Sequence, residues 1–252
     1  MKLFFRQSGD GPPLLVLHGL FGSSDNWYTL AKTFSAHFTV FLIDQRNHGQ
    51  SPHSDGFNYS VLTEDLQEFI EEHKLQKPAV IGHSMGGKTA MNFAVRYPDN
   101  LGKLIVVDIV PKAYPVHQDQ ILEGLLAVSA APLTSRNEAD QLLSAYVPEA
   151  GVRQFLLKNL SRKGTGGFEW KINIDAIHKN IEAMGVGMVQ EGTYKRSVLF
   201  VKGKRSNYYK EGDEMLIKKI FPQATFATLD TGHWVQAENP EAFGKLVLNY
   251  LL

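Results

Sequence analysis

The residue best placed to do covalent chemistry is a serine that lies between two glycines. Residues 82–86 read Gly-His-Ser-Met-Gly, a G-x-S-x-G pattern with Ser84 at its centre. A short apolar run precedes it at 79–81, and apolar residues at helical spacing follow over 87–96. A buried strand that turns sharply into a helix would strain Ser84 and expose its hydroxyl at the helix N-terminus. The pattern predicts a nucleophilic serine, although the same letters also occur in ordinary strand–helix turns.

A serine nucleophile needs a base, and the base needs an acid to orient it. Among nine histidines, His233 stands out because it follows a glycine and comes after the last expected strand. Functional side chains of a parallel sheet gather at such strand ends. The loop at 202–208 holds no carboxylate, whereas Asp108 ends the strand that follows the nucleophile helix. We therefore favour Asp108 as the acid, with Asp213 as the second candidate.

The developing oxyanion of an acyl-transfer reaction requires two backbone N–H donors. His18 and Gly19 follow a buried strand, which is where such a loop is needed, so the sequence predicts the amides of Leu20 and Met85 as the donors. His18 itself is expected to be structural. Aromatic and histidine side chains beside these groups are expected either to line a substrate pocket or to pack the core, namely Phe21, His83 and Trp234.

The elements that must position these residues alternate between apolar strands and helices. Strands are expected at 2–7, 14–17, 39–44, 79–81, 104–108, 197–201 and 225–229, and helices at 26–36, 60–74 (with Ser60 as N-cap), 211–221 and from Pro240 onward. Nearly unbroken apolar strands that alternate with helices predict an α/β fold with a mostly parallel, doubly wound sheet covered on both faces.

After Pro111 this alternation stops. Residues 112–190 are expected to be mostly helical pieces, such as 121–130 and 138–146, interrupted by glycines at 164, 166 and 167. We interpret 112–190 as a helical cap inserted after the strand ending at Asp108, and 1–111 with 191–252 as the core domain. The Leu, Ile and Met content of the cap suits an apolar acyl group, and it suits burial against the core equally well.

Composition excludes several classes of function. The chain has 252 residues, 26 basic and 26 acidic side chains and no cysteine. A net charge of zero argues against a nucleic-acid partner, and the lack of cysteine excludes disulfides and thiolate chemistry. No apolar run is long enough for a signal peptide or a membrane span, so a cytoplasmic protein is expected. We also expect a monomer or a homodimer. No phosphate-binding or metal-binding motif is present, so we expect no cofactor and no metal.

Taken together, these segments resemble the α/β-hydrolase superfamily over nearly the whole chain, and among its members the small YbfF-type serine esterases. The matching segments are 18–27, 44–51, 82–88, 106–111 and 232–234. The resemblance implies hydrolysis of short acyl esters and, for some members, acyl-CoA thioesters. It also implies an acid at the Asp108 position and a serine near Ser206.

Two alternatives to a serine carboxylesterase remain open. The first is different chemistry on the same fold, either a thioesterase or a lyase like the hydrolase-fold synthases of the menaquinone pathway. The second is a non-catalytic ligand-binding protein. The polar loop with Asp44, Arg46, His48 and Ser51 is interpreted as structural, and Lys88, near a helix N-terminus where the dipole disfavours a cation, is left without a role.

Overall fold

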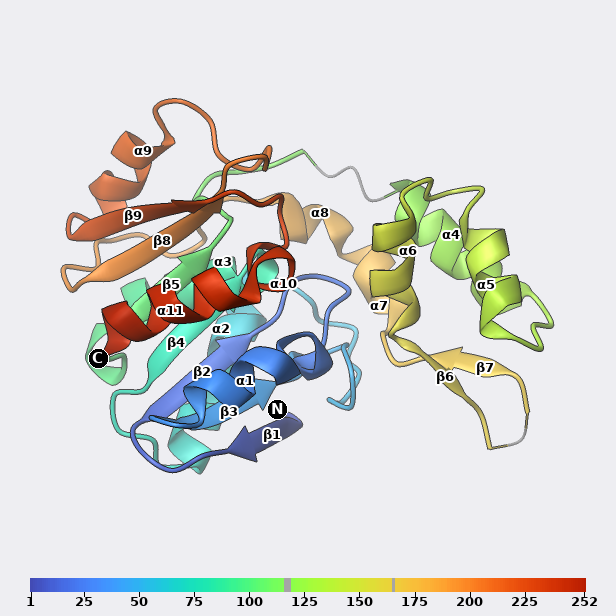
Figure 1. The fold of residues 1–252 in the computed structure, drawn as a ribbon, viewed down its shortest axis with the longest axis horizontal. Helices are drawn as coiled ribbons and strands as arrows, with labels where there is room; N and C mark the ends of the chain where they lie inside the picture. Colours follow the sequence, from blue (N-terminus) through green and yellow to red (C-terminus); the bar gives the residue numbers. More distant parts are fainter. Residues whose placement is uncertain (116–118, 165) are drawn as a thin grey trace.

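The computed structural model describes residues 1–115, 119–164 and 166–252. Within these ranges the main sheet has seven strands in the order β1-β3-β2-β4-β5-β8-β9 (Figure 1). The strands are β1 (Phe5–Ser8), β2 (Pro13–Leu17), β3 (Thr39–Ile43), β4 (Ala79–His83), β5 (Leu104–Val107), β8 (Val198–Gly203) and β9 (Ala224–Leu229). Every neighbouring pair is parallel except β1 with β3. The predicted mostly parallel sheet is confirmed.

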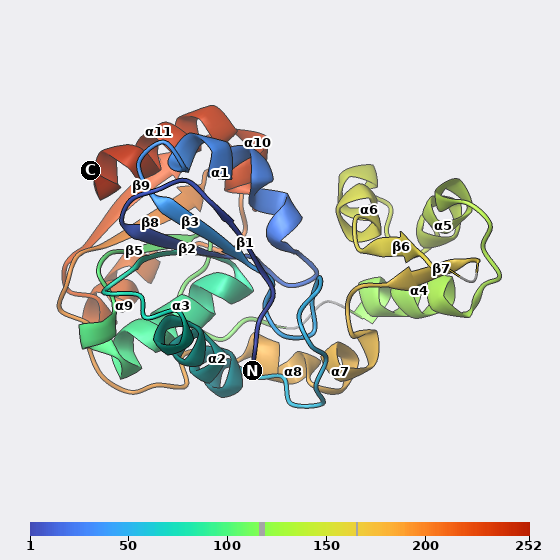
Figure 2. The ribbon, with the colours of Figure 1, turned by 90° about the horizontal axis from the view of Figure 1, so that it is seen from below.

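Helices cover both faces of this sheet, as its apolar strands require. One face carries α2 (Tyr59–Glu72), α3 (Met85–Arg96) and α9 (Asp213–Ile220), together with the short 3-10 turn η2 (Pro98–Asn100). The other carries η1 (Ser24–Trp27), α1 (Tyr28–Phe34), α10 (Val235–Glu238) and α11 (Pro240–Leu251) (Figure 2). All four residues of β5 are buried, as befits a strand in the middle of a covered sheet.

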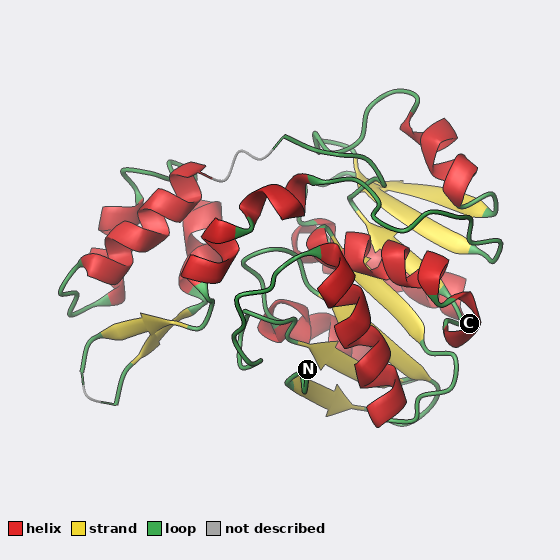
Figure 3. Ribbon diagram, turned by 180° about the vertical axis from the view of Figure 1, so that it is seen from behind, coloured by secondary structure: helices red, strands yellow, loops and turns green. Residues whose placement is uncertain are grey.

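The chain between β5 and β8 forms a group of elements beside the sheet (Figures 1 and 3). It contains α4 (Asp119–Ala130), α5 (Arg136–Leu143), α6 (Ala150–Leu157), the hairpin β6 (Leu160–Arg162) and β7 (Phe168–Trp170), α7 (Ile174–Lys179) and α8 (Ile181–Gly185). Its apolar side chains share one buried cluster with Phe21, Tyr59 and Met85 of the sheet side. This cluster joins the inserted elements to the strand ends.

Two local expectations were wrong, and one element was not expected. Besides the expected helices, the inserted segment contains the β6–β7 hairpin, because three-residue strands are too short to give an alternation pattern. Gly166 and Gly167, with positive φ, help to form its turn. Helix α2 is capped by Asn58, whose side chain accepts from Val61 N at 3.0 Å, and not by Ser60. The expected helix at 26–36 is a 3-10 turn followed by a shorter α-helix.

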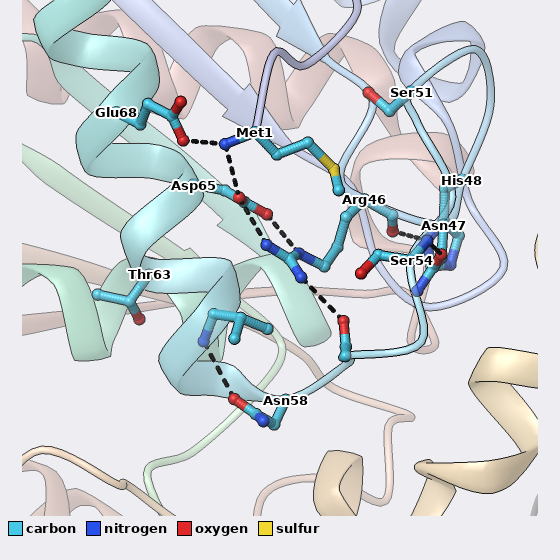
Figure 4. Close-up of polar contacts among 12 residues, drawn as sticks. Met1, Arg46, Asn47, His48, Ser51, Ser54, Asn58, Thr63, Asp65 and Glu68 are labelled. Atoms are coloured by element: carbon cyan, nitrogen blue, oxygen red, sulfur yellow. Dashed lines mark hydrogen bonds and ion pairs between the residues drawn. The ribbon is translucent and has the colours of Figure 1, made fainter.

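The polar loop after β3 is held by hydrogen bonds within the loop and to α2 and η1, which agrees with the interpretation of its polar residues as structural (Figure 4). The Arg46 guanidinium makes two bonds to Asp65 of α2, at 2.5 and 2.7 Å, and both side chains are largely buried. Asp44 accepts from Ser24 N at 2.6 Å and from Gln50 N at 2.9 Å. The loop therefore ties α2 and η1 to the end of β3.

Replacing Asp65 by Asn is expected to destabilise the fold by about 3–5 kcal/mol, because it leaves a buried guanidinium without its counter-charge. Urea unfolding measures this change. Asp230→Asn is the matched control: Asp230 also pairs with an arginine, but its side chain is 71% exposed, and such pairs contribute about 0–1 kcal/mol. Equal losses in the two variants would contradict the prediction.

Candidate active site

The turn between β4 and α3 places Ser84 in a strained conformation. Its φ is 51° and its ψ is −115°, outside the regions that side-chain-bearing residues normally occupy. A side chain at Gly82 would collide with the backbone of Gly86, and one at Gly86 would meet the Leu17 carbonyl oxygen of β2 at 2.5 Å. The two glycines are therefore what allows α3 to begin so close to β4 and β2. This geometry is that of a nucleophile elbow.

Asp108 lies one residue beyond β5, between the strands that lead to Ser84 and to the loop at 203–208. Its Oδ2 accepts from His233 Nδ1 at 2.7 Å. Its Oδ1 accepts from Gly203 N at 2.9 Å, and the Ser206 hydroxyl donates to Oδ2. Asp108 is fully buried, so these three donors replace the water that a carboxylate would otherwise bind. The order of the strands explains the position of Asp108, because β5, which precedes it, lies between β4 and β8 in the sheet.

Asp213, the second candidate for the acid, is engaged elsewhere. It begins α9, and both of its carboxylate oxygens accept from Lys112 Nζ, at 2.7 and 2.6 Å. Its Oδ2 also accepts from Lys210 N at 2.6 Å. The structure thus places Asp108, and not Asp213, against His233.

Two further side chains hold His233 in place. Tyr208 stacks on its imidazole, with ring centroids 4.1 Å apart and planes 18° from parallel. His83 Nε2–H donates to the His233 carbonyl at 2.9 Å. Burial, followed by the proximity of His233, lowers the pKa of His83 well below its ordinary value, so His83 is neutral. Nothing in the residue pattern singled out Tyr208, since its stacking arises only when the loop after β8 folds back.

The loop of residues 18–21 is fixed by two neutral histidines. His18 donates from Nδ1 to Gly19 O at 2.8 Å and accepts from Gln45 N at 3.0 Å. His48 donates to Arg46 O and accepts from Phe21 N at 3.1 Å. Burial lowers the pKa of His18 to about 4 and that of His48 to about 3, so both rings keep these bonds at neutral pH.

This loop runs directly beside the serine. A side chain added at Gly19 would lie 3.3 Å from Ser84 Cβ. Within the described residues, the amides of Leu20 and Met85 have no hydrogen-bond acceptor, although both lie at the loop or helix start next to Ser84. Two free N–H groups at this point could donate to an oxyanion on the Ser84 side.

A cavity of about 560 Å³ opens over these groups, and both Ser84 and His233 line it. The residues expected to form a substrate pocket all contribute to its wall, namely Phe21, His83 and Trp234. Phe155 of α6 faces Trp234 with ring centroids 5.5 Å apart, so the inserted segment supplies one side of the cavity and the core the other. The cavity is large enough for a drug-sized ligand.

The described ranges hold neither a cluster of metal ligands nor a membrane-spanning helix. In residues 1–115, 119–164 and 166–252, no group of three or more His, Asp or Glu side chains is placed to hold a metal ion. Over the same part of the chain, no helix has the length and apolarity to cross a membrane.

Comparison with known proteins places the chain in a family. A family model described as the alpha/beta hydrolase fold matches residues 12–129. Esterase YbfF of Escherichia coli is 34% identical over 95% of this chain and 92% of the relative. The mouse sn-1-specific diacylglycerol lipase ABHD11 is 37% identical over 95% of this chain and 81% of its own length. A solved structure described as a marine microorganism esterase is 44% identical, with a TM-score of 0.94 over 98% of both chains.

The fold and the site together define one class of protein, in which an α/β sheet carries a serine at the sharp turn from a strand into a helix. This chain belongs to the α/β-hydrolase fold family. The resemblance inferred from the sequence motifs, both to the superfamily and to the YbfF-type esterases, is confirmed.

Proposed function

We propose that this chain is a serine carboxylesterase that hydrolyses short-to-medium acyl esters through an acyl-enzyme on Ser84. The observation that carries the proposal is the 2.7 Å hydrogen bond from His233 Nδ1 to the buried Asp108 carboxylate. His233 lines the same cavity as the strained Ser84. A buried carboxylate that accepts from Nδ1–H fixes the tautomer in which Nε2 is free to act as a base. The esterase and lipase names of the relatives support the same reading.

In this mechanism His233 removes the hydroxyl proton while Ser84 Oγ attacks the ester carbonyl carbon. The Leu20 and Met85 amides donate to the oxyanion of the tetrahedral intermediate, and Asp108 stabilises the imidazolium. The intermediate collapses as the ester C–O bond breaks, and His233 protonates the departing alcohol. Water, activated by the same imidazole, then attacks the acyl-enzyme, releases the acid and restores Ser84.

We further propose that residues 112–190 act as a cap over a core of 1–111 and 191–252. The cap contributes Phe155 and neighbouring side chains to the cavity wall, so its shape would limit the length of the acyl or alcohol group. Trp234 and Phe21 would contact the substrate from the core side.

A fluorophosphonate probe should label the chain rapidly and once, because phosphonylation requires an activated serine. Ser84 Oγ would attack phosphorus and displace fluoride, and peptide mass spectrometry should locate the adduct on Ser84. A matched experiment on urea-unfolded protein controls for non-specific labelling. Hydrolysis of 4-nitrophenyl esters from acetate to palmitate should then give an optimum at short or medium length.

Two results would contradict the proposal. Folded protein that resists the probe would favour a non-catalytic binding protein. Rapid labelling without turnover of any oxygen ester would favour a selective thioesterase or a lyase on the same fold.

A further inference from the structure

A second, smaller cavity also reaches Ser84. It holds about 80 Å³, room for several water-sized groups at about 10–15 Å³ each. It shares three lining residues with the larger cavity, Leu20, Ser84 and Tyr208. The two cavities therefore meet at the serine, and a substrate bound there would extend into both.

Lys88 lines the smaller cavity although it is buried and, among the described residues, has no acidic partner. Its side chain is 1% exposed. Its ammonium donates to the Val186 carbonyl and lies 5.4 Å from the ring centroid of Tyr59 and 4.9 Å from that of Tyr114. In the described part of the chain no carboxylate forms an ion pair with it. A buried ammonium with one hydrogen bond retains two donors and an uncompensated charge, which is costly.

The position of Lys88 on α3 directs its side chain toward the N-terminus of the helix, next to Ser84. It is four residues after Ser84, so the two share a face, and Lys88 N donates to Ser84 O at 3.0 Å. Helical side chains lean toward the N-terminus, which here is the Ser84 end. Lys88 and Ser84 thus both line the smaller cavity.

The proposed role of His233 indicates which cavity holds the alcohol group of the ester and which holds the acyl group. His233 must protonate the leaving alcohol oxygen, so that group has to lie on the His233 side. His233 lines the larger cavity and, within the described residues, is not in the wall of the smaller one. The alcohol therefore belongs in the larger cavity, which leaves the smaller cavity beside Lys88 for the acyl group.

We propose that the smaller cavity is an acyl subsite selective for short acyl chains that end in a carboxylate, which Lys88 binds. This inference rests on the proposed esterase function. A carboxylate there would supply the counter-charge that Lys88 lacks and accept its remaining N–H donors, a charge-assisted pairing. The ring faces of Tyr59 and Tyr114 already stabilise the cation in the free protein.

The charge state of Lys88 at neutral pH agrees with this role. Burial lowers the pKa of Lys88 to about 8, so the side chain remains mostly an ammonium at pH 7. The titratable groups that line the smaller cavity with it are Tyr59, Tyr114 and Tyr208, whose pKa values burial raises, so these phenols stay neutral. Lys112, whose ammonium lies 5.5 Å from the ring centroid of Tyr114, is paired with Asp213. Preference for a carboxylate should therefore decline as the pH rises through about 8.

The test compares esters with one alcohol and matched acyl tails. Benzyl hydrogen malonate and benzyl hydrogen succinate carry a carboxylate where benzyl isovalerate and benzyl 4-methylpentanoate carry an isopropyl group of similar shape. The measured quantity is the ratio of kcat/KM for the carboxylate ester to that for its apolar match. We expect this ratio to exceed one in the wild type and to fall at least tenfold in Lys88→Met.

Lys88→Gln provides a second variant if Lys88→Met does not fold, and it should reduce the ratio similarly because it also lacks the charge. Lys2→Met is the matched control, since the Lys2 side chain is 86% exposed. A wild-type ratio below one, or a ratio that the Lys88 variants leave unchanged, would overturn the subsite. Hydrolysis of the apolar esters by wild type but not by Ser84→Ala tests the esterase function separately.

Discussion

Replacing Asp108 by Asn is expected to lower kcat by about 10⁴-fold, whereas Asp213→Asn is expected to change it only a few-fold. An amide at 108 can present its oxygen or its N–H₂ to His233, but it cannot accept all the donors that now converge on the carboxylate. The imidazole would then lose its fixed tautomer and the stabilisation of its protonated form. Steady-state hydrolysis of a 4-nitrophenyl ester near neutral pH measures both variants.

Asp213→Asn is a demanding control because it also breaks a close ion pair, that with Lys112. Any general consequence of losing an acidic side chain from this part of the fold would appear in both variants. Thermal unfolding of the two proteins establishes that each is folded before the rates are compared. A larger loss of activity in Asp213→Asn than in Asp108→Asn would reverse the assignment of the acid.

The sheet and the placement of Asp108 near the end of β4 could be predicted because they depend on strand order. Apolar strands that alternate with helices leave few alternatives to a parallel sheet with both faces covered. Once the strand ending at Asp108 is placed beside the strand ending at His83, the residues after the two strands must lie close together. Pairing of His83 with Val107 in the observed register gives this proximity. The absence of a carboxylate at 202–208 then pointed to the neighbouring strand.

The loop at 203–208 shows what sequence could not reveal. It lacks a carboxylate, yet it supplies Gly203 N and the Ser206 hydroxyl to Asp108 and the Tyr208 ring to His233. These contacts depend on how an irregular loop folds back over a strand end, and no periodicity encodes that path. Ser206 was indicated only by the family resemblance.

Lys88 illustrates a different limit. At a helix N-terminus a lysine is unfavourable, and the residue pattern indicates no role for Lys88. The structure instead gives it a carbonyl and two aromatic faces, contributed by residues 59, 114 and 186, which are distant in sequence. Because its surroundings are assembled from three separate segments, only the folded chain reveals that the described residues give this cation no counter-ion.

Ser84→Ala is expected to lower kcat by about 10⁵–10⁶-fold, an effect comparable to that of losing the base His233. Without Oγ no acyl-enzyme can form, so the reaction would have to proceed by direct attack of water. The amides of Leu20 and Met85 and the cavity would remain, and they account for the small residual rate above the uncatalysed reaction that such variants retain. Ester hydrolysis at high enzyme concentration measures this residual rate.

Ser206→Ala is the matched control for Ser84→Ala because it removes a hydroxyl from the same site without removing the nucleophile. Its hydroxyl donates to Asp108 and accepts from Tyr208 N at 3.3 Å. We expect a loss of at most about 10²-fold, in line with the roughly 1.5–3 kcal/mol of a hydrogen bond to a charged group. The acyl-enzyme separates the two roles further, since rapid mixing should give a burst of 4-nitrophenol with Ser206→Ala and none with Ser84→Ala. A burst that survives in Ser84→Ala would mean that another residue carries the acyl group, and the elbow serine would not be the nucleophile.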